Sequence, residues 1–183
     1  MQAIATALGR VSSGLNRIAL WGAVAAVIVM TFSAGYQVVA RYVFDAPPVW
    51  TEELARRAMV WAGMLGASAA FHDRADPNLF PHMLKVSGGR GLALTLLRSA
   101  GVAIFALPIL YYSLFGPNFS LARGFIGRSL DRKAEMMGIS MAWFTAAIPV
   151  AFALIIIHVA AHIARSLADM EETIQSPAED SPL

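Results

Sequence analysis

The side chains best suited to binding chemistry lie in one short segment, where two acidic residues are followed at helical spacing by two basic ones. Glu52 and Glu53 precede Arg56 and Arg57, respectively, by four residues. On a helix this spacing brings a carboxylate beside a guanidinium. The segment therefore predicts two ion pairs, Glu52–Arg56 and Glu53–Arg57, at the start of a helix, where exposed amide dipoles also favour the acidic side chains.

Two interpretations of these ion pairs are open. An exposed pair is a solvated helix start that contributes only a few tenths of a kcal/mol. Charges that enter a membrane instead pair with one another or face the protein interior. Trp50 and Trp61 flank the pairs and Arg41 precedes them, which favours the second interpretation and a cluster that Arg41 approaches.

Small residues follow on the same helix. Gly63 and Ala67, and likewise Gly66 and Ala70, are four residues apart. This spacing lets the backbone of a neighbouring membrane helix approach closely. The neighbour is either the third span of this chain or another subunit.

The sequence gives little support for catalysis or for a bound cofactor. The chain has no cysteine, so thiolate, iron–sulfur and cysteine–zinc chemistry are excluded. No HExxH or GxSxG motif occurs. His158 and His162 lie one turn apart near the end of an apolar stretch, where we expect them to meet interfacial water or the last carbonyls. A haem held by histidines is the alternative, and we expect no cofactor.

The elements that carry these residues are membrane helices. Of the 183 residues, 57% are hydrophobic and 14% charged, whereas soluble domains have about 25% charged residues. Because a span needs about 20 apolar residues, we expect an all-α integral membrane protein of about four transmembrane helices. The expected spans are 18–40, 51–71, 92–115 and 136–163, in a membrane domain of residues 1–168.

Prolines and charge predict the interruptions. Pro47 and Pro48 require a break at 46–49, after which Thr51 can cap the second helix. Pro108 and Pro149 should distort the third and fourth helices. Residues 169–183, which are acidic and lack aromatics, should form a short disordered tail.

Net charge says little about partners or orientation. The formal net charge is +2 and the basic residues are scattered, so we expect no nucleic-acid partner. Basic residues are equally frequent on the two sides of the expected spans. Arg10 and Arg17, just before the first span, favour cytoplasmic termini.

The segment from Arg41 to Ala70 resembles a known family. Arg-Tyr-Val-Phe, a turn, Trp-Thr-Glu-Glu-Leu-Ala-Arg, and then Trp-x-x-x-Leu-Gly-Ala are similar to the hallmark of the small, DctQ-like membrane subunit of tripartite ATP-independent periplasmic (TRAP) transporters. Chain length and a last span with a tryptophan and a mid-helix proline also fit. The chain departs from the family between Phe71 and Arg90, where His82 is followed by Met83 and no acidic residue is near.

The resemblance implies a non-catalytic scaffold in the bacterial inner membrane, surrounded by membrane lipid. It implies two protein partners, a large TRAP membrane subunit and a periplasmic substrate-binding protein, and sodium-coupled uptake of an organic acid. A haem-bearing anchor of a respiratory enzyme is the alternative function. The residues expected at the interface with a partner are Arg41, Trp50, Glu52, Glu53, Arg56, Trp61, Gly63 and Gly66.

Overall fold

The computed structural model describes residues 2–73 and 88–175, and this part of the chain is helical throughout apart from its connections. One isolated β-bridge, between Lys133 and Ser140, interrupts the helical pattern there. The all-α fold class is thus confirmed. The helices are α1 (Gln2–Tyr42), α2 (Val49–His72), α3 (Gly88–Leu114), α4 (Phe125–Leu130), α5 (Ala142–Thr145) and α6 (Ala147–Gln175), with two short 3-10 turns, η2 (Pro117–Phe119) and η3 (Leu121–Arg123).

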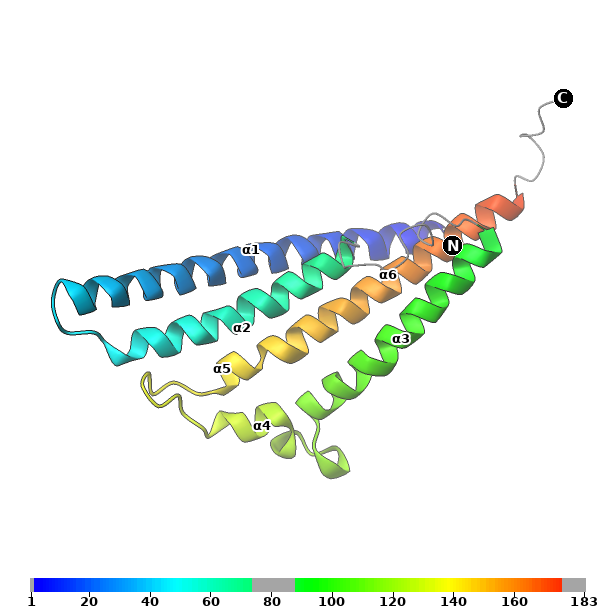
Figure 1. Cartoon of the computed structure of the whole chain (residues 1–183). Helices are drawn as coiled ribbons and strands as arrows, with labels where there is room; N and C mark the ends of the chain where they lie inside the picture. The colour runs from blue at the N-terminus through cyan, green and yellow to red at the C-terminus, as the bar shows by residue number, and fades with distance from the viewer. Residues whose placement is uncertain (1, 74–87, 176–183) are drawn as a thin grey trace.

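The long helices form a fan (Figure 1). They converge at the end that carries the N-terminus and the end of α6, and they spread at the end that carries α4. α1 packs along α2, α6 contacts both of them, and α3 lies against α6. The fan therefore has a narrow terminal end and a wide end that holds the α1–α2 turn and the α3–α5 connection.

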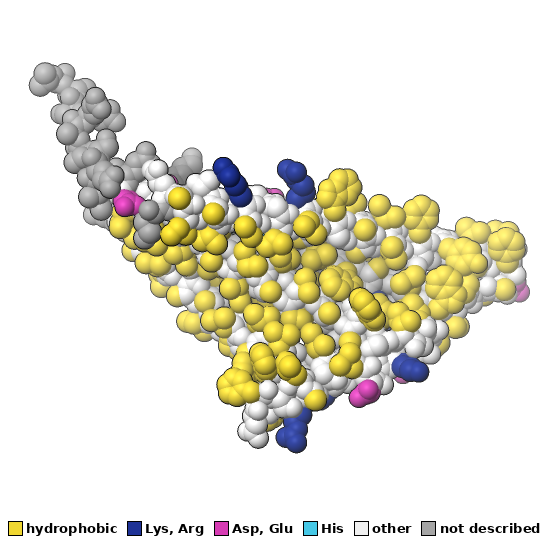
Figure 2. Space-filling view, turned by 180° about the vertical axis from the view of Figure 1, so that it is seen from behind, with side chains coloured by type: hydrophobic (Ala, Val, Ile, Leu, Met, Phe, Trp, Pro, Cys, Tyr) yellow, Lys and Arg dark blue, Asp and Glu magenta, His cyan; other side chains and the backbone are white. Residues whose placement is uncertain are grey.

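Small residues lie between the helices and large apolar residues face outward. The buried apolar residues are mostly alanines, among them Ala19, Ala69, Ala106 and Ala147. Apolar side chains cover most of the broad face that Figure 2 shows. This distribution suits a lipid environment, where apolar surface needs no burial and close packing of small residues holds helices together.

Within residues 2–73 and 88–175, three helical stretches are long and apolar enough to cross a membrane: Gln2–Tyr42, Gly91–Leu114 and Ala142–Glu171. α2 is not among them, because its first turns carry the Glu52–Arg57 charges. Its 24 residues nevertheless extend for about 36 Å, and it packs along α1. That α2 forms a fourth span remains a prediction.

Helix ends differ from those expected of the spans. α1 begins at Gln2 and ends at Tyr42, so that the break before α2 covers 43–48. The fourth apolar stretch becomes helical only at Ala142, and α6 continues to Gln175, through the first part of the expected tail. The remainder of that tail lies outside the described residues.

The two internal prolines act differently. α5 and α6 are separated at Ala146, one turn before Pro149, whose missing N–H cannot bond to the carbonyl of Thr145. The expected distortion is therefore found there. α3, in contrast, continues through Pro108 without a break.

The connection between α3 and α5 folds back on the wide end of the fan. A Cβ on Gly124 would lie 2.2 Å from the carbonyl oxygen of Leu114, so only glycine allows this return. Tyr111 packs against Phe115 and Phe119, with ring centroids 5.7 and 5.6 Å away. Aromatic residues at one end of a membrane helix are typical of the membrane–water interface.

Candidate partner interface

The start of α2 is organised by Pro48 and Thr51. The helix begins at Val49, directly after Pro48, and no side chain caps it. The Thr51 hydroxyl donates to the Pro48 carbonyl at 2.7 Å and is fully buried. The expectation that Thr51 caps the helix was wrong, since the helix starts two residues earlier and the hydroxyl donates where a cap would accept.

Both predicted ion pairs form, and they differ in burial. Glu52 and Arg56 are 3.2 Å apart, with side chains 63% and 68% exposed. Glu53 and Arg57 are 3.1 Å apart, with side chains 9% and 31% exposed. The solvated interpretation therefore describes the first pair and the protein-facing interpretation the second, because helix geometry turns adjacent residues about 100° apart.

Glu53 connects α2 to a distant part of the chain. Its second carboxylate oxygen accepts a hydrogen bond from the backbone N–H of Met136 at 2.9 Å. The guanidinium of Arg57 lies over the ring of Phe144, 5.5 Å from its centroid. The buried pair thus holds the segment that precedes α5, and α5 itself, against the first turns of α2.

A polar pocket of about 280 Å³ adjoins Glu53. Sequence reasoning did not assign Arg132, Lys133 or Glu135 to this place, although the structure brings them there with Arg56 and Arg57. The charged residues of Asp131–Glu135 could have indicated a polar site in the sequence. Their distance from Glu53 along the chain gave no indication that the two segments meet.

Trp50 and Trp61 contact other helices of the same chain at the wide end of the fan. Trp50 stacks on Tyr36 of α1, with ring centroids 6.2 Å apart. Trp61 donates its indole N–H to the backbone carbonyl of Trp143 at 3.1 Å. Each tryptophan therefore joins α2 to a neighbouring helix, α1 or α5.

Arg41 does not join this cluster. It lies exposed in the last turn of α1, and within the described residues it forms no ion pair with Glu52 or Glu53. The expected approach was wrong. A basic residue is favourable in the last turn of a helix for a local reason, since the carbonyl ends there carry partial negative charge.

The small residues of α2 face outward. A Cβ on Gly63 or Gly66 would meet nothing within 4 Å. The glycine that lets α1 approach α2 is Gly22, where a Cβ would lie 2.8 Å from Leu65 Cδ1. Sequence reasoning missed Gly22. The small-residue face of α2, Gly63 and Gly66 with the adjacent Ala67 and Ala70, is thus not used by α3, which packs on α6.

A polar network lies toward the narrow end, with Ser12 and His158 buried and Asp73 exposed. The Ser12 hydroxyl and His158 Nδ1 are 2.7 Å apart, and His158 is fully buried. Asp73 Oδ1 lies 2.7 Å from His72 Nδ1 and 3.4 Å from Asn16 Nδ2. The expectation that His158 meets interfacial water was wrong, because α1 covers it with Ser12.

The same network bears on the haem alternative. The rings of His72 and His158 contact edge to face, with centroids 4.9 Å apart. No space for a porphyrin lies between rings in direct contact, so this pair does not fit a bis-histidine haem site. The pair instead fixes the end of α2 against α6.

Comparison with known proteins places the chain in a family. The family model described as tripartite ATP-independent periplasmic transporters, DctQ component, matches residues 30–169. No curated protein matches the chain in a sequence search. The part of the family comparison that rested on His82 and Met83 lies outside the described residues. The match covers the end of α1, all of α2 and α3, the Glu53 cluster and most of α6. The chain therefore belongs to the DctQ family as the small, multi-pass inner-membrane component of a TRAP transporter.

Proposed function

We propose that this chain is a non-catalytic scaffold that holds the large TRAP membrane subunit through the outer face of α2. Membership of the DctQ family implies association with that subunit and with a periplasmic binding protein. The observation that carries the proposal is the contrast within α2. Glu53 fixes the helix to its own chain, while the small-residue face is open to a neighbour.

The residues proposed for the interface divide by their contacts. Glu52 and Arg56 are exposed and are available to a partner, as are Gly63 and Gly66. Glu53, Trp50 and Trp61 contact their own chain and act on the interface by positioning α2. Arg41, exposed at the end of α1, is the remaining candidate for direct contact.

The transported substrate in this proposal is an organic acid, delivered by the binding protein and taken up with sodium by the large subunit. Reconstitution tests the assignment. Vesicles that contain this chain, the large subunit and the binding protein should accumulate a labelled carboxylate only under an inward sodium gradient. Vesicles that contain this chain alone should accumulate none. Uptake by the chain alone would contradict the scaffold role.

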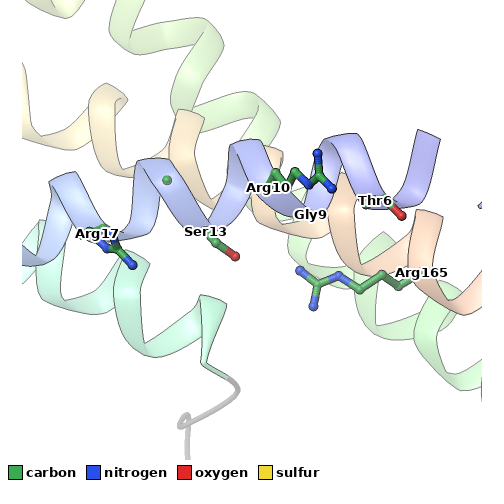
Figure 3. Close-up of a pocket in the computed structure, with 7 residues that line it drawn as sticks. Thr6, Gly9, Arg10, Ser13, Arg17 and Arg165 are labelled. Carbon is green, nitrogen blue, oxygen red and sulfur yellow. The ribbon is translucent and has the colours of Figure 1, made fainter. Parts of the chain in front are cut away.

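Both termini are proposed to lie in the cytoplasm. Arg10, Arg17 and Arg165 gather at the narrow end of the fan (Figure 3), and basic residues beside spans favour the cytoplasmic side. Because the chain has no cysteine, single cysteines report the topology without interference. Ala3→Cys should react with an impermeant maleimide only after lysis, whereas Asn118→Cys should react in intact cells. The reverse pattern would invert the orientation.

A further inference from the structure

A basic groove runs between α1 and α6 at the narrow end of the fan (Figure 3). Its polar lining consists of Arg10, Arg17, Arg165, Thr6 and Ser13. None of the described residues that line it is acidic. Its volume of about 490 Å³ lies within the usual range for small-ligand sites. The groove thus offers three guanidinium groups and two hydroxyls to one ligand.

The three arginines line the groove from two helices, α1 and α6. Arg10 and Arg17 are seven residues apart and lie on one face of α1. Arg165 reaches across from α6, and its Nε lies 3.7 Å from where a Cβ on Gly9 would be. Figure 3 shows the Arg165 side chain extending beneath α1 toward the space beside Ser13.

Charge in the groove is poorly balanced. Arg10 and Arg17 form no ion pair with another described residue, and Arg165 Nε is shielded from solvent without a hydrogen-bond partner. Asp169 lines the adjoining groove beside Arg165 and brings one negative charge to this end of α6. Three arginines that line one groove favour an anion with several acceptor oxygens, as in a phosphate group.

An apolar stripe accompanies the basic residues. Ile4, Val11 and Ile18 recur every seven residues on α1 and are 61%, 54% and 70% exposed. Val11 and Ile18 directly follow Arg10 and Arg17 in the sequence, which places the stripe about 100° around α1 from the arginines and outside the groove. The stripe nevertheless lies at the same level of α1 as the groove. Exposed apolar side chains at this level suit surrounding acyl chains, so a lipid headgroup can supply the phosphate.

We propose that this groove binds the phosphate-bearing headgroup of an anionic phospholipid. The arginines neutralise the phosphate, and Ser13 donates a hydrogen bond to it. The site is placed where the apolar run of α1 begins, which is the level of the headgroups. Its lipid would join α1 to α6 at the point where the fan converges, independently of the side of the membrane on which the termini lie.

Lipid titration of the full chain tests the proposal. The delipidated protein in neutral detergent is titrated with phosphatidylglycerol, phosphatidylcholine or inorganic phosphate, and binding is followed by native mass spectrometry and by the shift in melting temperature. We expect phosphatidylglycerol to bind and to stabilise, and the other two to have little effect. Because a basic residue near an anionic surface contributes about fivefold in affinity, the Arg10→Gln/Arg17→Gln variant should bind roughly 25-fold more weakly.

The control is Arg123→Gln/Arg128→Gln, which removes two exposed arginines at the wide end and should leave phosphatidylglycerol binding unchanged. Arg10 and Arg17 are exposed, so their variant should fold and melt as the wild type does without lipid. Equal affinity of wild type and Arg10→Gln/Arg17→Gln for phosphatidylglycerol would overturn the proposal. So would equal binding of phosphatidylcholine, or stabilisation by inorganic phosphate alone, which would indicate a soluble-anion site.

Discussion

The Glu53 carboxylate accepts a hydrogen bond from the backbone N–H of Met136 at 2.9 Å, although 83 residues separate the two in the chain. The same carboxylate pairs with Arg57 at 3.1 Å. Glu53 therefore has both an ionic and a backbone partner in a place that solvent hardly reaches. Among the described residues, its neighbour Glu52 pairs with Arg56 alone, on the exposed side of the helix.

Glu53→Gln and Glu52→Gln make a matched pair. Glu53→Gln leaves Arg57 without its counter-charge in a half-buried position, so the yield of the complex with the large subunit should fall roughly tenfold. Glu52→Gln removes an exposed pair and should leave the yield within experimental error. Co-purification from cells, with expression of each subunit measured separately, decides the matter. Equal yields for the two variants would contradict a role for Glu53 in assembly beyond that of an exposed ion pair.

Gly63→Leu tests the small-residue face. Since nothing in the described part of the chain lies within 4 Å of the added Cβ, the isolated subunit should keep its melting temperature. A leucine there would block close approach of a partner helix, so complex formation should fall. Gly35→Leu, at an equally open and exposed position of α1, is the matched control. Loss of the complex for both variants, or for neither, would contradict a specific role for the α2 face.

Gly22→Leu should behave in the opposite way to Gly63→Leu. Its Cβ would lie 2.8 Å from Leu65 Cδ1, so a larger side chain requires that Leu65 repacks or that α1 and α2 separate. Overpacking of this kind costs about 1–3 kcal/mol, and the isolated subunit should melt at a lower temperature. An unchanged melting temperature would show that the contact between α1 and α2 accommodates the larger side chain without cost.

Trp50 and Tyr36 should be energetically coupled. Their stacked rings join α1 to α2 next to the Pro47–Pro48 break. A double-mutant cycle with Trp50→Ala and Tyr36→Ala should give a coupling of about 0.5–1.5 kcal/mol in the unfolding free energy of the isolated subunit. The control cycle pairs Tyr36→Ala with Trp143→Ala instead of Trp50→Ala. Trp143 is 71% exposed, and this cycle should give no coupling. Equal coupling in both cycles would contradict a direct contact.

Ser12→Ala should destabilise the isolated subunit. The change removes the hydroxyl 2.7 Å from His158 Nδ1 and leaves a polar atom of a fully buried ring without this partner, at a cost of about 1–3 kcal/mol. Ser13→Ala, on the exposed side of α1, should stay within about 0.5 kcal/mol. Thermal unfolding in lipid-free detergent measures both. Identical melting temperatures would show that water replaces the Ser12 hydroxyl.

Much of the architecture could be predicted from the sequence because membranes impose strong local constraints. Apolar length required helices, Pro47 and Pro48 required a break, and i, i+4 spacing required the pairs Glu52–Arg56 and Glu53–Arg57, all of which the structure contains. These features depend on the neighbouring residues of one segment. The family could be identified for the same reason, since its hallmark lies within a single helix–turn–helix stretch.

Only the tertiary structure decided which ion pair is buried and which glycine packs. Spacing treats Glu52 and Glu53 alike, and Glu53 differs only because the backbone before α5 returns to it with a free N–H at Met136. Gly22 and Gly63 are likewise both glycines within apolar helices, yet only Gly22 faces Leu65. Any residue carries a backbone N–H, and the rotation of a helix against its neighbours depends on all their contacts together. Such long-range relationships leave no mark in the residue types or in their spacing.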